Sequence, residues 1–545
     1  MKRSTFFAPG LGLLIVSLGC GGPSGGEGES SGTSEETGPV RGGTVVIGIP
    51  AGPDNLIDAT SSTAVGDEVI ARMFLPLTSL AADLESYEPE LARRWESSED
   101  GRSVTFHLAE NARWHDGEPV TSADVLFTHE LLTDPLVGYS ARSYKDFITD
   151  VVADDDFTVT FHFDRRYPYQ VLDASAGAIL PEHLLKDAPR DQLVATDFAR
   201  HPVGCGPFKF SRWEPQQFVE LVANDDYFEG RPYLDRVLFR IVPEKTSLIT
   251  QLETGEIDVM PNVPPHEIER LRKSAKHIRI QASEDRNYTY IGWDSTNPLF
   301  ASARVRRALG MAIDREGLIQ SLCYGFADPI DGPIHPRLWA HNPAIQPLPY
   351  DPAAARALLA EEGWVDSDGD GWLDKNGEVF EFILKTNLGN QVRMDATILI
   401  QSMLQKVGVK VEPRTYEWNV LWSSVIDHSY ESAVLVGWSI ALKIDLKATF
   451  HTEAISGKFN HTEYSNPRVD ELIDGALAAE TFEEARPLWY EVQERIVADQ
   501  PYTFLYTIQS LLGVNERVRG TAPDFRGTYD NLHEWWIPSA RQRRR

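Results

Sequence analysis

Aspartates at alternate positions form the motif with the most specific chemistry in this sequence. Asp366, Asp368, Asp370 and Asp374 occupy the first, third, fifth and ninth positions of one segment, and Gly371 occupies the sixth. Oxygen ligands at alternate positions with a glycine at the sixth are the pattern of a calcium-binding loop. The twelfth position, which would supply a bidentate carboxylate, is another glycine. Two alternatives therefore stay open: a loop that binds structural calcium, and a turn that needs no ion.

Motifs for catalysis are largely missing. The sequence has no His-Glu-x-x-His, no Cys-x-x-Cys and no phosphate-binding loop. Gly-x-Ser-x-Gly occurs at 22–26 and 28–32, but a nucleophile elbow needs a strand before the serine and a helix after it. Both copies lie in a stretch of mostly Gly, Ser, Glu and Thr, which forms neither element. We therefore expect no enzyme and no obligatory cofactor, and the sequence disfavours an extracytoplasmic hydrolase.

Two cysteines follow Cys20 in the sequence, Cys205 and Cys323. In an exported protein they could pair, but a disulfide needs Cα atoms within about 7 Å of each other. Cys205 falls in a glycine-rich loop, and Cys323 falls at the end of an expected helix. We favour two free thiols.

Helices and strands are expected to alternate along the chain. Residues 44–49 and 104–108 have the apolar patterns of strands. Asp351-Pro352 and Asn466-Pro467 each combine a capping side chain with a first-position proline, which predicts a helix start. Residues 398–407 are expected to be helical as well. This alternation indicates α/β lobes.

The charge of the chain limits its partners. Its 545 residues contain 52 Lys and Arg against 81 Asp and Glu, a formal net charge of -29 with a pI near 4.9. A field of that sign repels phosphate backbones, so we expect no nucleic-acid partner. The length suggests three or so domains.

The N-terminus has the features of an export signal. Lys2 and Arg3 precede an apolar segment at 6–18, which is too short to span a bilayer. Cys20 follows this segment, at a position that resembles the lipidation site of bacterial lipoproteins. We therefore expect a lipoprotein signal peptide at 1–20 and a flexible tether at 21–40. The protein would be extracytoplasmic, in the periplasmic space or at the cell surface, and held to the membrane by its lipid.

Several blocks of sequence resemble one known family. They include Trp114-His115-Asp116-Gly117-Glu118-Pro119 with the Pro-Glu-Leu-Ala that precedes it at 89–92, Gly204-Cys205-Gly206-Pro207-Phe208, Asn224-Asp225-Asp226-Tyr227, and Asn297-Pro298-Leu299-Phe300. These blocks are similar to those of the family 5 extracellular solute-binding proteins, the receptors of peptide- and nickel-type ABC importers. Cys205 departs from the Thr or Ser that is usual in its block.

The resemblance implies a bilobal type II periplasmic-binding-protein fold with an additional domain and a hinge between the lobes. Lobe one would be discontinuous, formed by 41–80, 190–290 and 510–540. Residues 81–189 would form the additional domain, and 291–509 would form lobe two. Closure about the hinge is how ligand binding becomes a shape that another protein can detect.

The resemblance also implies which segments border the ligand cleft. They carry the candidate binding residues Asn55, Gly204, Cys205, Trp293, Trp418 and Trp438. A Trp offers a large apolar face and one hydrogen-bond donor, which suits a site that accepts many side chains. Core packing is the alternative for each of these tryptophans.

One departure from the family concerns the ligand's charge. Peptide binders of the family place an aspartate three residues after the Trp that corresponds to Trp438, and here that position is Ala441. Asp445 could instead hold a ligand amine, or Lys443 a ligand carboxylate. The third alternative is that both side chains are solvated.

The expected function is that of an ABC importer's receptor. It would close on an oligopeptide or peptide-like solute and deliver it to a permease with its ATPase. A sugar or metal-chelate receptor and a signalling receptor are the alternatives.

Overall fold

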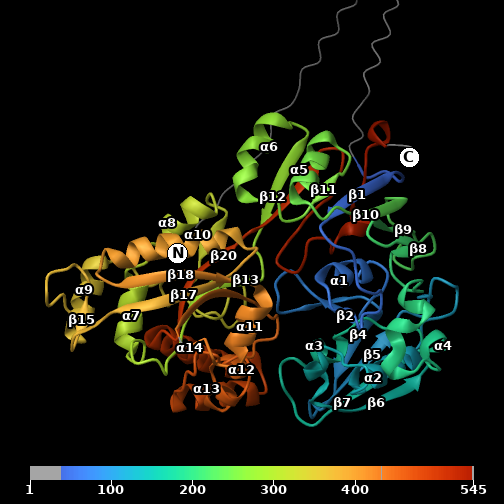
Figure 1. Ribbon diagram of the computed structural model, residues 1–545. Coiled ribbons are helices and arrows are strands. Elements are labelled where there is room, and N and C mark those ends of the chain that lie inside the picture. Colours follow the sequence, from blue (N-terminus) through green and yellow to red (C-terminus); the bar gives the residue numbers. More distant parts are fainter. Residues whose placement is uncertain (1–37, 431, 543–545) are drawn as a thin grey trace, which may run out of the picture. The chain divides into compact units, whose positions relative to one another are not determined.

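The computed structural model of the protein describes residues 38–430 and 432–542 (Figure 1). The expected signal peptide, Cys20 and the tether up to residue 37 lie outside these residues. Within them, none of the helices combines the length and the apolar character that crossing a bilayer requires.

A seven-stranded sheet forms the core of lobe one. Its order is β12 (Ile278–Ser283), β21 (Ser510–Asn515), β11 (Val259–Met260), β1 (Thr44–Ile49), β10 (Arg236–Ile241), β9 (Phe218–Ala223) and β8 (Phe208–Glu214). β1 runs parallel to both β10 and β11, and the remaining pairs are antiparallel. The helices α5 (Lys245–Thr254) and α6 (Ile268–Ser274) lie beside β11 and β12 (Figure 1). Strands from both ends of the chain therefore build one sheet.

A six-stranded sheet forms the core of lobe two. Its order is β14 (Ala327–Pro329), β20 (Tyr502–Ile508), β13 (Asn287–Trp293), β19 (Ala433–Ser439), β17 (Glu381–Asn387) and β18 (Lys410–Tyr416). The helices that pack around it are α7 (Ala303–Met311), α8 (Arg315–Leu322), α9 (Pro352–Glu361), α10 (Gln391–Gln405), α11 (Trp418–Ile426), α12 (Lys447–Phe450), α13 (Pro467–Ala478) and α14 (Phe482–Asp499). The hairpin of β15 (Asp374–Lys375) and β16 (Glu378–Val379) follows the aspartate-rich loop.

The additional domain, which comes in the sequence between the first two segments of lobe one, contains a four-stranded antiparallel sheet. Its order is β4 (Ala92–Ser97), β5 (Ser103–Leu108), β7 (Thr158–Phe163) and β6 (Ile148–Asp155). α2 (Ser122–Thr133) packs on it, and α3 (Gln170–Ser175) and α4 (Glu182–Leu185) follow. α1 (Ala64–Ile70) and the hairpin of β2 (Thr78–Leu80) and β3 (Tyr87–Pro89) precede it.

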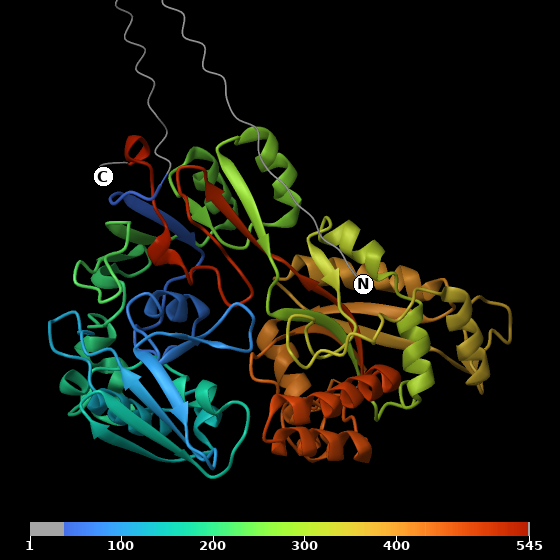
Figure 2. The same ribbon diagram turned by 180° about the vertical axis from the view of Figure 1, so that it is seen from behind.

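The chain passes between the two large sheets at 284–286 and at Gln509, and these crossings are adjacent. β12 pairs with β21 on one side, and β13 pairs with β20 on the other (Figure 2). The boundary expected at 290/291 is therefore misplaced, because all of β13 from Asn287 pairs in the second sheet. Periodicity could not locate this boundary, since β12 and β13 are both apolar strands.

Local signals placed several elements correctly. β1 has the expected bounds, and the side chains of Asp351 and Asn466 cap α9 and α13 by accepting backbone N–H groups. α10 begins at Gln391, seven residues before the expected start, because Asn390 caps it ahead of the apolar stripe.

A buried ion pair joins the C-terminal segment to the first sheet. Arg517 Nε donates to Asp258 Oδ1 at 2.6 Å, and a second guanidinium nitrogen donates to Oδ2 and, at 2.8 Å, to the carbonyl of Thr44. Asp258 Oδ2 also accepts the N–H of Val46 at 2.9 Å. Every polar atom of the carboxylate has a partner, which a buried charge requires.

We expect Asp258→Ala to lower the free energy of unfolding of lobe one by about 3–5 kcal/mol, because it leaves a buried guanidinium without its anion. Chemical unfolding followed by tryptophan fluorescence measures this. The matched control is Glu412→Ala, which removes a carboxylate from an exposed pair with Arg414 and should leave the unfolding curve unchanged. Equal curves for the two variants would contradict the role given to Asp258.

Candidate ligand-binding site

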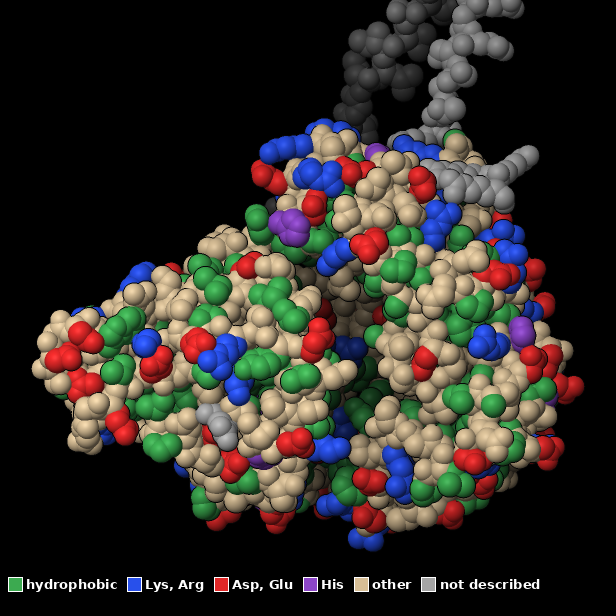
Figure 3. Space-filling model, in the orientation of Figure 1, with side chains coloured by type: hydrophobic (Ala, Val, Ile, Leu, Met, Phe, Trp, Pro, Cys, Tyr) green, Lys and Arg blue, Asp and Glu red, His purple; other side chains and the backbone are tan. Residues whose placement is uncertain are grey.

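A cavity of about 650 Å³ lies between lobe one, the additional domain and lobe two. Its walls come from the segment 71–76 after α1, the β2–β3 hairpin, α3 and the C-terminal segment, and Leu442 reaches it from lobe two. Figure 3 shows the surface hollowed between the two halves of the protein. Another hollow, of about 680 Å³, is lined by residues 93–110 and 155–158 of the additional domain alone, so lobe closure would not enclose it. The cavity between the lobes is therefore the candidate ligand site.

Carboxylates dominate the charged lining of this cavity. The lining includes six of them and two guanidinium groups: Asp58, Glu88, Glu90, Glu229, Asp530 and Glu534, with Arg72 and Arg526. Arg72 pairs with Asp530 at 3.5 Å, and Arg526 pairs with Asp524 and, at 3.3 Å, with Glu88. Because six carboxylates face two guanidinium groups, acidic groups still outnumber basic ones in the lining of the cavity.

Burial shifts the proton affinity of two of these carboxylates. It raises the pKa of Asp58 to about 6, against a hydrogen bond from the N–H of Ala178 that lowers it. It raises the pKa of Glu90 to about 7, against a hydrogen bond from Ser79. Both groups bind a proton more readily than an exposed carboxyl, and a cation in the cavity would favour their ionised forms.

Three of the predicted ligand residues, Asn55, Gly204 and Cys205, make contacts within their own loops or are buried. Asn55 is buried, its oxygen accepts from the N–H of Ile57 and its nitrogen donates to the carbonyl of Thr60. Gly204 lies so close to Met73 that a Cβ would come within 2.0 Å of the Met73 carbonyl oxygen. Cys205 is fully buried, and burial raises the pKa of its thiol to about 12. None of the three residues lines the cavity, and a ligand contact at any of them stays a prediction.

Cys205 and Cys323 are both free and buried, so the expectation of two free thiols is confirmed.

The predicted tryptophans divide into two groups. Trp293 is fully buried in the core of lobe two, where it packs on Phe300 and Phe382, which is the core-packing alternative. Trp418 is exposed and stacks on Trp422 with ring centroids 5.3 Å apart. Trp422 in turn contacts Trp438, whose indole donates to Tyr502 at 3.3 Å. A ligand contact at Trp418 or Trp438 stays a prediction.

Lys443 and Asp445 both point away from the cavity. Lys443 Nζ donates to the two carboxylate oxygens of Asp173 in the additional domain, at 2.9 and 2.7 Å. Asp445 is exposed and accepts the N–H of Lys447 at 2.8 Å. Neither side chain lines the cavity, and a ligand contact at either one stays a prediction.

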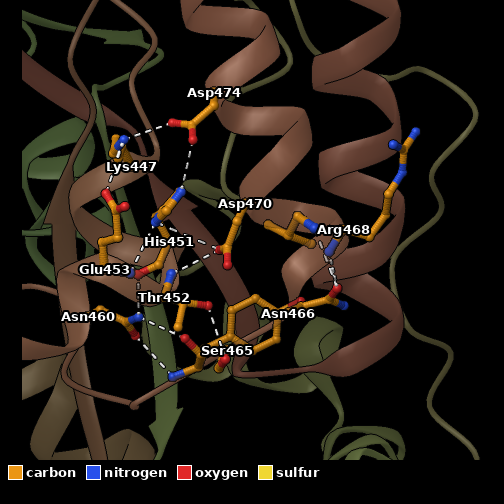
Figure 4. Close-up of polar contacts among 12 residues, drawn as sticks. Lys447, His451, Thr452, Glu453, Asn460, Ser465, Asn466, Arg468, Asp470 and Asp474 are labelled. Atoms are coloured by element: carbon orange, nitrogen blue, oxygen red, sulfur yellow. Dashed lines mark hydrogen bonds and ion pairs between the residues drawn. The ribbon is translucent and has the colours of Figure 1, made fainter.

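The segment after Asp445 is anchored to α13 (Figure 4). Lys447 Nζ donates to Asp474 at 2.7 Å. His451 Nδ1 accepts the N–H of Glu453, so its Nε2 carries the proton and faces Asp474 Oδ2 at 3.4 Å. The N–H of Thr452 donates to Asp470 at 2.9 Å. These contacts fix one end of the loop that carries Lys443.

Sequence reasoning missed the carboxylates that line the cavity. Asp58, Glu90 and Asp530 lie far apart in the sequence, in a chain with 81 acidic side chains. No spacing distinguishes them from the others, and only the folded backbone brings them together.

Comparisons with known proteins found matches to this chain in both sequence and structure. Residues 86–451 match the bacterial extracellular solute-binding proteins, family 5. The oligopeptide-binding protein AppA of Bacillus subtilis is 31% identical over 534 residues, which cover 96% of this chain and 97% of AppA. The structure of AppA in complex with a nonapeptide superposes with a TM-score of 0.75 at 30% identity and covers 92% of this chain and 100% of AppA's chain.

Two further relatives extend the range of the likeness. Heme-binding protein A of Haemophilus influenzae is 26% identical over 86% of this chain and 87% of its own length. The ABC transporter substrate-binding protein CtaP of Listeria monocytogenes has the same fold, with a TM-score of 0.82 at 22% identity, over 91% of this chain and 99% of CtaP. The bilobal fold expected from the sequence is therefore confirmed.

The aspartate-rich loop brings three of its four predicted ligands together. Ligand oxygens of Asp366, Asp368 and Asp370 lie within 4.8 Å of one another, and all three side chains are exposed. Asp374 instead accepts the N–H of Ser367 at 2.9 Å. Asp366 accepts the N–H of Gly369 and of Gly371, so the turn is also held by its own hydrogen bonds. Calcium and an ion-free turn both remain compatible with this arrangement.

We expect millimolar calcium to raise the melting temperature of the EDTA-treated protein by about 2–4 °C, since an ion bound only by the folded loop stabilises it by mass action. Differential scanning calorimetry measures the shift. Asp368→Asn should abolish it, whereas Asp427→Asn, which changes an aspartate outside the loop, should not. A melting temperature that calcium leaves unchanged would leave only the ion-free turn.

Proposed function

The chain belongs to the family 5 bacterial extracellular solute-binding proteins, and we propose that it is the receptor of an ABC importer for an oligopeptide or peptide-like solute. The solute binds between the lobes and is delivered to a permease with its ATPase. This role needs no catalysis, since the protein only binds, closes and releases.

The acid-lined cavity between the lobes is the observation that supports this proposal best. A volume of about 650 Å³ holds several residues of an extended peptide. Glu90 and Asp58 offer anions to the ammonium group of a peptide's amino terminus or of a basic side chain. They supply the charge that Ala441 cannot.

A metal chelate or haem is a weaker candidate. The relative from Haemophilus influenzae is named for haem binding. Haem carries two carboxylates, and a cavity with six carboxylates and two already paired guanidinium groups repels them. A sugar or a signalling ligand has no observation in its favour.

The lipid anchor is the second part of the proposal. Cys20 follows the short apolar segment and precedes the polar tether. A diacylglycerol on this thiol would keep the receptor at the membrane surface, and residues 21–40 would give it reach.

The ligand is testable by native mass spectrometry of the purified protein, in which we expect a mixture of peptides to co-purify. A single sugar or chelate, or no ligand after mild purification, would contradict the peptide proposal.

Glu90→Gln should weaken binding of peptides with free amino termini by about 2 kcal/mol, because the ammonium loses a partly buried anion. Glu90, with its pKa near 7, is ionised above that pH and protonated below it, and Asp58 follows near pH 6. Affinity in the unaltered protein should therefore fall as the pH is lowered from about 8 to about 5. Isothermal titration calorimetry with a nonapeptide library measures both effects.

The controls separate this contact from general electrostatics. Glu96→Gln removes an exposed carboxylate of the additional domain outside the cavity and should leave affinity unchanged. N-acetylated peptides should bind equally to Glu90→Gln and to the unaltered protein. If acetylation does not reduce the effect of Glu90→Gln, the ammonium does not lie at Glu90.

Cys20→Ser should release the protein from the membrane fraction into the soluble fraction, because the lipid attaches to this thiol. Fractionation of expressing cells followed by immunoblotting measures the distribution, with Cys323→Ser as the matched control. The anchor is refuted if the Cys20 variant stays in the membrane pellet as fully as the control does.

A further inference from the structure

Lys443 makes an ion pair that joins two parts of the protein. It follows β19 of lobe two, whereas its partner Asp173 lies on α3 of the additional domain, 270 residues earlier in the chain. The carboxylate of Asp173 is fully buried and the lysine side chain is 15% exposed. The pair therefore exists only while the second lobe lies against the additional domain.

Four aromatic rings surround the ammonium group. Lys443 Nζ lies 5.2 Å from the ring centroid of Tyr144, 5.7 Å from those of Phe147 and Tyr167, and 5.9 Å from that of Tyr169. Rings within about 6 Å of a cation attract it through their negative faces. Together with Asp173 these rings form a cage, and every member of the cage belongs to the additional domain.

The members of the cage are also held by contacts with one another and with their neighbours. Tyr167 Oη donates to Asp173 Oδ2 at 2.7 Å, and Lys145 Nζ donates to the carbonyls of Asp173 and Ala174 at 2.8 and 3.2 Å. Phe147 and Tyr167 pack edge to face with centroids 5.0 Å apart. Burial raises the pKa of Asp173 above the ordinary carboxyl value. Without Lys443 the carboxylate keeps the Tyr167 donor and the nearby Lys145 but loses its direct ion pair, which is costly for a desolvated charge.

The loop that presents Lys443 is also held in place. The N–H of Ile444 donates to Tyr169 Oη at 3.0 Å, so backbone and side chain both reach the additional domain. Beyond Asp445 the segment is bound to α13 through Lys447, His451 and Thr452 (Figure 4). Because the segment beyond Lys443 is anchored, the entropy lost when the ammonium enters the cage is mainly that of the lysine side chain.

We propose that the cage is a cation-binding site for the chain's own Lys443 and that it locks the closed conformation. When the lobes open, the ammonium returns to water and Asp173 loses its partner. When they close, one ion pair and four cation–π contacts form together. The lock stabilises the closed state independently of the ligand's chemistry and slows ligand release. It rests on the proposed function only in requiring that the two lobes open and close.

Other contacts across the same interface limit the effect of the lock. Leu84 from the β2–β3 hairpin packs into the apolar core of lobe two, and Trp339 of lobe two donates to Tyr169 at 3.1 Å. Removal of Lys443 should therefore shift the population toward open forms without abolishing closure.

Electron paramagnetic resonance tests the lock without any ligand. Spin labels on Glu99→Cys and Glu483→Cys lie on opposite sides of the crevice between the additional domain and lobe two. Cys205 and Cys323 are buried and should not be labelled, and Cys20 is replaced by Ser in every labelled variant. With Lys443→Met we expect the short-distance population to fall and a longer distance to appear, while Lys443→Arg restores part of the short distance. The control Lys410→Met breaks an exposed pair within lobe two and should keep the original distribution.

Two further measurements separate the lock from a folding defect and from the identity of the ligand. Dissociation of the co-purified solute from Lys443→Met should be about tenfold faster than from Lys410→Met. Lys443→Ala should bind n-butylammonium, measured by calorimetry, and the double variant with Asp173→Asn should not. Unchanged distances in Lys443→Met, or no binding of n-butylammonium to Lys443→Ala, would overturn the proposal. The distance measurement and the n-butylammonium measurement do not depend on whether the natural ligand is a peptide.

Discussion

The pairing of two adjacent chain crossings is the constraint on which the rest of the structure depends. β12 and β21 pair in the first sheet, and their continuations β13 and β20 pair in the second. Each lobe therefore contains one pair of neighbouring strands, and both strands of the pair continue into the other lobe side by side. Such a double connection lets the lobes rotate about a short axis while their sheets stay intact. The Arg517–Asp258 pair fixes the C-terminal segment beyond this axis to β1.

The loop after Trp438 shows how a shared fold can reassign charge. Ala441 removes the carboxylate that would meet a ligand amine, and Lys443 turns away from the cavity toward Asp173. Meanwhile carboxylates on the opposite wall, Glu90 among them, supply negative charge to the cavity. Charge for the ligand and charge for closure thus reside on different elements, and each can change without loss of the other.

Much of the fold could be predicted from the sequence, because its signals are local. Capping residues such as Asp351 and Asn466 act on backbone N–H groups within three residues of themselves, and the apolar run of β1 needs no distant partner. The site could not be predicted in the same way. Trp293 looks like any other tryptophan near a cleft until its packing on Phe300 is known. The Asp173–Lys443 pair joins residues 270 apart, and no pattern in the sequence links them.

A lock made from the chain's own lysine has a consequence for selectivity. A receptor that closes only through contacts with the ligand must use part of the ligand's binding energy to bring its lobes together. Here Lys443, the aromatic cage and Leu84 contribute to closure, and none of them needs the ligand. The closed state is then less sensitive to the length and side chains of the solute. Under this proposal the cavity itself would discriminate between ligands, by charge through its partly buried carboxylates and by size through its volume.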